Sequence, residues 1–186
     1  MTLLKLSGVA CDRGGRRLFD SLDLVLEAGG AALVTGANGA GKSSLIRLAA
    51  GLLPAASGEV ERGGRVALAD ESLALDPKLG LGAALAFWAR LDGAEPAPAL
   101  AAMGLAAIAD LPVRMLSTGQ RKRAALARVI ASGAPLWLLD EPANGLDPDG
   151  EARLESAMAS HRSAGGAILA ASHQPLALPG AVRVAL

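Results

Sequence analysis

This sequence has few aromatic residues, a single cysteine and no net charge. Its 186 residues include one Cys, two Phe, two Trp and no Tyr. The single Cys11 permits no internal disulfide and no thiolate metal cluster, which is typical of a reducing compartment. So few rings cannot form a base-stacking platform for single-stranded nucleic acid. With 18 basic and 18 acidic residues the formal net charge is zero and no basic block is present, so we expect no nucleic-acid partner.

A membrane-spanning segment is also missing from the pattern. The longest uncharged stretch, Ser163–Val182, has about the length of a spanning helix. Three glycines, two prolines, a His and a Gln interrupt it, and lipid cannot satisfy the backbone groups that they free. Hydrophobic residues make up 52% of the chain, enough for the core of one compact domain. So high a hydrophobic share has two explanations, an exposed apolar surface that binds a partner and a composition that is simply rich in Ala. The sequence favours the two about equally.

Strand patterns and helix patterns alternate along the chain. Such alternation predicts an α/β fold with a mostly parallel sheet and helices on both faces, preceded by an antiparallel β element. We expect a single domain, 1–186, with a core of 1–75 and 133–186 and a small helical subdomain at about 76–132. The expected strands are 3–9, 22–26, 31–35, 59–62, 65–69, 136–139, 167–171 and 182–186, and the expected helices include 42–52, 120–131 and 151–162.

A glycine-rich loop follows the strand expected at 31–35 and matches the pattern G-x-x-x-x-G-K-[ST]. Glycines let backbone N–H groups converge on phosphate oxygens, and the following helix adds its N-terminal dipole. Lys42 would reach the β- and γ-phosphates, and the Ser43 hydroxyl would bind Mg²⁺. The alternative, an ordinary turn before a helix, is disfavoured by this strand–loop–helix context. The phosphate-binding residues are then Gly36, Ala37, Asn38, Gly39, Ala40, Gly41, Lys42, Ser43 and Ser44.

Two carboxylates end the apolar strand expected at 136–139. Asp140 would hold Mg²⁺, and Glu141, one position further, would polarise the attacking water. Taken alone, such residues are more often an ordinary solvated strand end. A phosphate loop upstream makes the metal and water roles the better interpretation.

A third motif, Leu116-Ser117-Thr118-Gly119-Gln120, opens a long helical pattern. A Ser and a Gly amide at a helix N-terminus form an anion site, although an isolated pentapeptide of this kind is more often an ordinary cap. With the other motifs in this order, the chain resembles the ATP-binding-cassette (ABC) ATPases, whose own motif is LSGGQ and from which Thr118 departs. The resemblance spans nearly the whole chain and also includes Leu139-Asp140-Glu141-Pro142, Gly145-Leu146-Asp147 and His173.

This resemblance implies a P-loop NTPase fold and an ATP-hydrolysing function with ATP and Mg²⁺. It implies that Glu141 acts on water and that His173 contacts the γ-phosphate. Ser117, Gly119 and Gln120 of a second ATP-binding subunit would close each site in a head-to-tail dimer. Integral membrane transporter subunits would be the partners, and the chain would lie peripherally on the cytoplasmic face of the bacterial inner membrane.

A narrower resemblance points to one branch of the family. Val9–Arg13, Arg17–Phe19, the phosphate loop and Ser172–Leu176 look like the haem-exporter ATP-binding subunits of cytochrome c maturation. The implied function is to power haem export or handling for c-type cytochrome biogenesis. The alternatives are an ABC ATPase for another cargo, such as lipoprotein or drug export, and a non-hydrolysing nucleotide-gated regulatory module. The presence of Glu141 and His173, the residues implied to act in hydrolysis, disfavours the non-hydrolysing module.

Besides Thr118, two positions depart from the family pattern. ABC ATPases usually carry a Gln that meets Mg²⁺ and the membrane subunit after the strand at 65–69, where this chain has Asp70-Glu71-Ser72. We align Glu71 there, within one residue, as a further Mg²⁺ ligand; a solvated acidic turn is the alternative. Many members stack adenine on an aromatic ring near the first hairpin, where Arg13 falls here. Its guanidinium can stack on a base, and a solvated turn Arg is the alternative.

Overall fold

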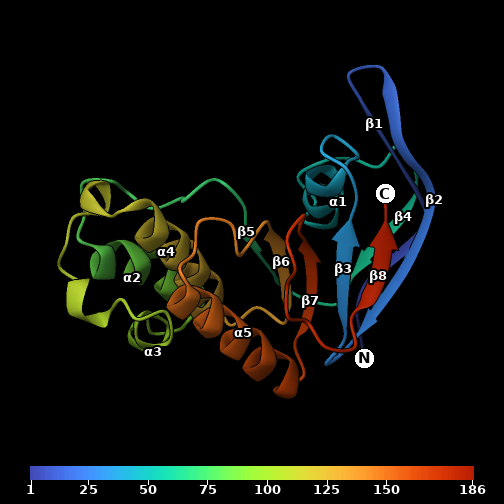
Figure 1. Cartoon of the computed structure of the whole chain (residues 1–186). Helices are drawn as coiled ribbons and strands as arrows, with labels where there is room; N and C mark the ends of the chain where they lie inside the picture. The colour runs from blue at the N-terminus through green and yellow to red at the C-terminus, as the bar shows by residue number, and fades with distance from the viewer.

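The centre of the molecule is a five-stranded parallel sheet. In the computed structural model, which describes residues 1–186, its strand order is β5-β6-β7-β3-β8 (Figure 1). Every neighbouring pair is parallel. β3, β6 and β7 are almost wholly buried, as expected for near-continuous apolar strands covered on both faces. The strands are β3 (Ala31–Thr35), β5 (Val66–Ala69), β6 (Leu136–Asp140), β7 (Ala167–Ala171) and β8 (Val182–Ala185).

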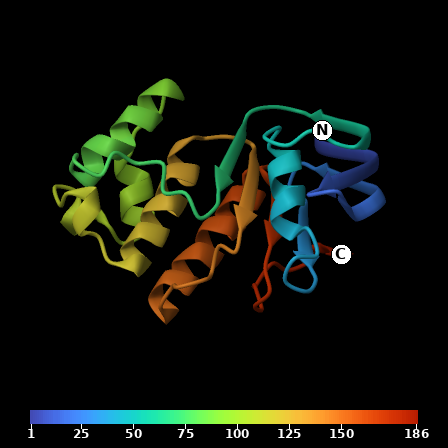
Figure 2. The ribbon, with the colours of Figure 1, turned by 90° about the horizontal axis from the view of Figure 1, so that it is seen from above.

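A second sheet of three antiparallel strands, in the order β2-β1-β4, flanks the first. Its long hairpin, β1 (Thr2–Arg13) and β2 (Arg16–Glu27), turns at Gly14-Gly15 and is joined by β4 (Ser57–Arg62). The strands expected at 59–62 and 65–69 therefore lie in different sheets. Figure 1 shows this sheet on the opposite side of the parallel sheet from α2 and α3, and the view from above in Figure 2 agrees.

Helices cover both faces of the parallel sheet. α1 lies between the two sheets, whereas α4 and α5 cover the other face (Figures 1 and 2). Arg62 of β4 caps the C-terminus of α1. Its guanidinium donates at 2.6 and 2.7 Å to the carbonyls of Ala49 and Leu48, which have no partner within the helix. The helices are α1 (Lys42–Ala49), α2 (Leu81–Leu91), α3 (Ala97–Ala102), α4 (Thr118–Ala131) and α5 (Pro148–Ser163), with 3₁₀ turns at η1 (Ala106–Ile108) and η2 (Val113–Met115).

Two apolar clusters fill the interior, one on each face of the parallel sheet. Alternate residues of β6 serve both: Leu136 and Leu138 face the cluster with α1 and the hairpin, and Trp137 and Leu139 face the cluster with the helical region. The second cluster continues without a break from the sheet into the helical region. The predicted α/β fold, with its parallel sheet and N-terminal antiparallel element, is confirmed. The division into core and subdomain stays a prediction. None of the helices is both long and apolar enough to cross a bilayer.

Candidate active site

The phosphate loop lies between β3 and α1, with its backbone held open for an anion. Gly36 lies so close to Leu186 that a Cβ would come 2.5 Å from the carbonyl oxygen of Leu186. Gly41 has φ +115°, a conformation that L side chains rarely adopt. Lys42 is 7% exposed, and its Nζ donates to the carbonyls of Gly36 and Ala37 at 2.9 and 3.1 Å. The ammonium therefore lies inside the loop, where phosphate oxygens would replace these carbonyl partners.

A cavity of about 230 Å³ opens over this loop. It contains one carboxylate, Glu141, which comes from the end of β6. It also contains Leu18 of β2, because the hairpin reaches across the loop. No role at the site is predicted for Leu18 from the sequence, since the segment Arg17–Phe19 enters only as part of the family resemblance. The lining residues are Leu18, Asn38, Gly39, Gly41, Lys42, Ser43, Ser44 and Glu141.

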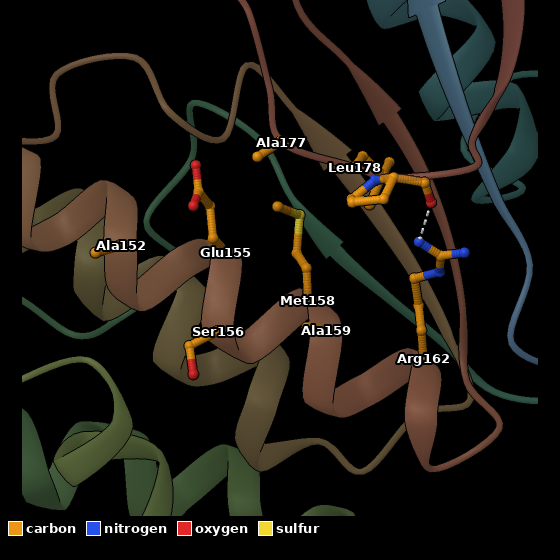
Figure 3. A pocket seen from close by; sticks show the side chains of 9 residues that line it. Ala152, Glu155, Ser156, Met158, Ala159, Arg162, Ala177 and Leu178 are labelled. Atoms are coloured by element: carbon orange, nitrogen blue, oxygen red, sulfur yellow. Dashed lines mark hydrogen bonds between the residues drawn. The ribbon is translucent and has the colours of Figure 1, made fainter.

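A larger cavity, of about 520 Å³, lies between α5 and the segment after β7 (Figure 3). Its floor is apolar, with Met158 and Leu178, and Arg162 on its rim donates to the carbonyl of Pro179 at 2.7 Å. None of the residues expected to act on a phosphate lines it. Residues expected to act on a phosphate line the smaller cavity over the phosphate loop instead.

Asp140 ends β6 as a buried carboxylate that lacks a full set of partners. It is 6% exposed, and its Oδ1 atom has no hydrogen-bond partner. Burial raises the pKa of Asp140, and the charge of Glu141 adds to this, whereas Ser43, Arg47 and Lys122 act in the opposite direction. A buried carboxylate oxygen without a donor is costly unless a cation faces it. With the Ser43 hydroxyl beside it, this oxygen fits a hard cation such as Mg²⁺.

Glu141 of the phosphate cavity pairs with His173, which lines a separate cavity of about 420 Å³ together with Gly36. Glu141 has φ +47°, which is strained for this residue type, and its N–H donates to the carbonyl of Ala171 at 2.8 Å. Its Oε2 lies 2.8 Å from Nδ1 of His173 and accepts the backbone N–H of His173 at 3.2 Å. The loop after β7 thus fixes the carboxylate that the turn after β6 projects. The two residues expected to act in catalysis touch directly.

The third motif caps α4 and lies apart from the phosphate cavity. Ser117 Oγ accepts the Gln120 N–H at 3.2 Å, and Gln120 Oε1 accepts the Ser117 N–H at 2.9 Å. This capping box occupies the Gln120 side chain and leaves Ser117 and Thr118 exposed. Gly119 packs against the loop after β6, since a Cβ there would lie 3.3 Å from the Gly145 carbonyl oxygen. Within one chain these residues do not line the phosphate cavity.

The two departures from the family pattern lie outside that cavity. Arg13 is exposed at the end of β1, paired across the turn with Arg16. Glu71 is exposed in the turn after β5 and lines a separate cavity of about 430 Å³. The adenine role of Arg13 and the metal role of Glu71 stay predictions.

The fold and these sites define an ATP-binding subunit of the ABC transporter class. The family model described as "ABC transporter" matches residues 19–144. The chain is 61% identical to the cytochrome c biogenesis ATP-binding export protein CcmA of Sphingopyxis alaskensis, over 95% of this chain and 93% of that protein. It is 58% identical to the CcmA protein of Novosphingobium aromaticivorans, over 91% and 88%. The chain belongs to the ABC transporter family, in the branch formed by the CcmA proteins.

Solved structures agree on the fold. An ATP-binding subunit of an ABC transporter has a TM-score of 0.84 at 23% identity, over 92% of this chain and 80% of that one. An ABC transporter ATP-binding protein from Pyrococcus furiosus has a TM-score of 0.86 at 19% identity, over 98% and 96%. Both predicted resemblances are confirmed. As a member of this family the chain binds ATP and is an ATP-hydrolysing transport ATPase that works as a dimer with membrane subunits.

Proposed function

We propose that this chain hydrolyses ATP at the Glu141–His173 pair to power haem export or handling during c-type cytochrome biogenesis. The role in cytochrome c biogenesis is supported by the 61% identity to a cytochrome c biogenesis ATP-binding export protein. The hydrolysis step is supported by one observation above the others, the 2.8 Å contact between Glu141 and His173 at the phosphate cavity. A module that only binds nucleotide would not need a strained carboxylate there.

The phosphate loop binds the triphosphate. Its backbone N–H groups and the N-terminus of α1 face the phosphate oxygens, and Lys42 exchanges its two carbonyl partners for the β- and γ-phosphates. Ser43 and Asp140 would hold Mg²⁺, which neutralises charge on these phosphates when bound. We keep Glu71 as a further candidate ligand, one that would have to move from its exposed position.

Glu141 orients the attacking water. The water oxygen attacks the γ-phosphorus in line with the breaking bond to the ADP oxygen, a proton of the water passes to the Glu141 carboxylate, and ADP leaves. Nδ1 of His173 faces Glu141, which leaves Nε2 as the ring nitrogen available to the γ-phosphate. With a proton on both ring nitrogens, the ring would donate to the carboxylate from Nδ1 and to the γ-phosphate from Nε2, which would stabilise charge on the transferred group.

A second copy completes the site. Ser117 and Gly119 lie outside the phosphate cavity of their own chain, at the exposed N-terminus of a 14-residue helix. In a head-to-tail dimer they would face the γ-phosphate held by the partner, and the dipole of α4 would favour that negative charge. Two ATP molecules would then lie between the copies, and hydrolysis would let the dimer open.

The membrane partner would dock on the helical region. Phe87 and Leu91 lie one turn apart on α2 and are 58% and 67% exposed. Leu79 and Met115 are also exposed, on segments joined by the hydrogen bond from Val113 N–H to the Leu79 carbonyl. Exposed apolar side chains of this size suit a protein partner. We assign this surface to integral membrane subunits, with the chain peripheral on the cytoplasmic face of the bacterial inner membrane.

ATP turnover by the purified chain tests the hydrolysis step. Glu141→Gln keeps the shape of the side chain and removes its charge, so it should retain ATP binding, lose nearly all turnover and accumulate as an ATP-bound dimer on size exclusion. Glu155→Gln, an exposed carboxylate on α5, is the matched control and should turn over like wild type. Near-normal turnover of the Glu141→Gln protein would overturn the assignment.

A further inference from the structure

Lys122 lies on α4 and reaches the end of β6, where the hydrolysis site begins. Its Nζ donates to the backbone carbonyl of Asp140 at 3.4 Å. The contact joins a residue three positions after Gly119 to the strand end that presents Asp140 and Glu141. Lys122 is half-buried, and no carboxylate lies within ion-pair distance of its ammonium. This charge is therefore held near the site without being neutralised by a direct partner.

Acidic groups face Lys122 from two elements. Burial lowers the pKa of Lys122, and the carboxylates of Asp140, Glu141, Glu71 and Asp70 act in the opposite direction. Asp70 and Glu71 belong to the turn after β5 and line the cavity of about 430 Å³ together with Lys122. Two of these charges lie on the rim of this cavity and two at the end of β6, and all four repel one another and an incoming triphosphate.

The other cations near this rim are placed differently. Arg121 also lines the cavity, but its guanidinium donates to the carbonyls of Leu116 and Arg114 at 3.1 and 2.9 Å. Arg47 faces Asp140 from α1, on the other face of the sheet. Lys122 is thus the cation of the cavity whose charge is available to both acidic pairs.

We propose that Lys122 is a positioning residue for hydrolysis, which holds the strand end of Asp140 and Glu141 and balances the acidic turn of Asp70 and Glu71. This inference rests on the proposed function. Through its hydrogen bond the ammonium fixes the backbone from which both site carboxylates project. Through its charge it offsets the repulsion between the acidic turn and the site. Because it lies one turn into α4, it also links the Ser117 end of that helix to the same strand end.

Kinetic variants test the positioning role. Lys122→Met removes the charge at similar length, Lys122→Arg keeps it, and Lys78→Met removes an exposed Lys that lines neither cavity. Lys122→Met should lower kcat about tenfold, the effect of losing one charged hydrogen bond, and leave the Kd for ATP measured without Mg²⁺ within about twofold. Lys122→Arg should keep most of the turnover, and Lys78→Met should match wild type.

A second carboxylate variant tests the charge balance. Glu71→Gln removes one repelling charge, so in the Lys122→Met background it should recover at least about threefold in kcat, a coupling expected between neighbouring charges. In the nucleotide-free chain, the thermal midpoint of Lys122→Met should rise more steeply with NaCl than that of wild type, because salt screens the unbalanced repulsion. Should Lys122→Met not fold, Lys122→Gln replaces it in both measurements.

Three results would overturn the proposal: wild-type kcat in the neutral variant, a Lys122→Arg protein no more active than Lys122→Met, or equal salt dependence of the two midpoints. Failure of the proposed function is recognised separately. In that case Glu141→Gln turns over ATP at the wild-type rate, while the salt dependence of the nucleotide-free chain still reports on Lys122.

Discussion

Replacing Asp140 by Asn should stabilise the nucleotide-free chain and abolish its hydrolysis. Asp140 is 6% exposed and its Oδ1 has no partner, so without a bound cation the folded chain bears the cost of a buried, partly unsatisfied carboxylate. Asn keeps the shape and removes the charge. We expect a gain of about 1–2 kcal/mol in the free energy of unfolding at neutral pH. For a chain of this size that is about 2–8 °C in the thermal midpoint.

The stability gained by Asp140→Asn should depend on pH in a direction set by the pKa of Asp140. Because burial raises the pKa of Asp140, the contribution of this residue to stability is fully present below the ordinary carboxyl pKa and is lost as the pH rises through the folded-state pKa. The gain from Asp140→Asn should therefore be present at neutral pH and disappear in acid. Thermal unfolding across this range, with and without MgATP, is the assay. A lower midpoint for Asp140→Asn at neutral pH would refute the view that Asp140 is poised for a cation.

Three further predictions concern separate parts of the molecule. Ser117→Arg should preserve ATP binding by the phosphate loop but block dimer closure and turnover; mixing it with Lys42→Ala protein should restore partial activity through one intact site, and no rescue by demonstrated heterodimers would contradict shared sites. Arg13→Ala should weaken ATP binding several-fold while Arg13→Tyr preserves it, and unchanged affinity in the Ala variant would assign Arg13 to the solvated surface. His161 stacks on Trp137 with ring centroids 3.9 Å apart, and burial lowers the pKa of His161 below its ordinary 6.5. The contribution of His161 to stability is present above pH 6.5 and should fall, as the pH drops towards the folded-state pKa, by up to about 1.4 kcal/mol per pH unit. His161→Phe should remove this slope of stability against pH. An equally steep slope in that variant would contradict the role of His161.

Features set by neighbouring residues could be predicted from the sequence. The phosphate loop is one of them, because its glycines, its Lys and the helix that follows occupy a single short segment. The strand ending in Asp140 is another, since an apolar run that stops at a carboxylate needs no distant partner to be recognised. The family resemblance supplied Glu141 and His173 as residues, each from its own motif.

Features that depend on distant segments could not be predicted. The contact between Glu141 and His173 joins residues 32 positions apart. It depends on the positive φ of Glu141, a backbone conformation that a Glu in the sequence does not predict. Leu18 enters the phosphate cavity only because the hairpin folds over the loop. Lys122 occupies a charged position in a helical pattern, where a solvated side chain is the ordinary expectation. Only the packing of α4 against the sheet brings it to Asp140.

The central claim is that ATP hydrolysis at Glu141 powers c-type cytochrome biogenesis. Its most direct test is the amount of covalently haem-loaded c-type cytochrome in a strain that lacks this gene and carries either the wild-type chain or Glu141→Gln at equal protein level. The account predicts normal haem loading with wild type and almost none with Glu141→Gln. Normal haem loading with the variant, or in the strain without either chain, would contradict it.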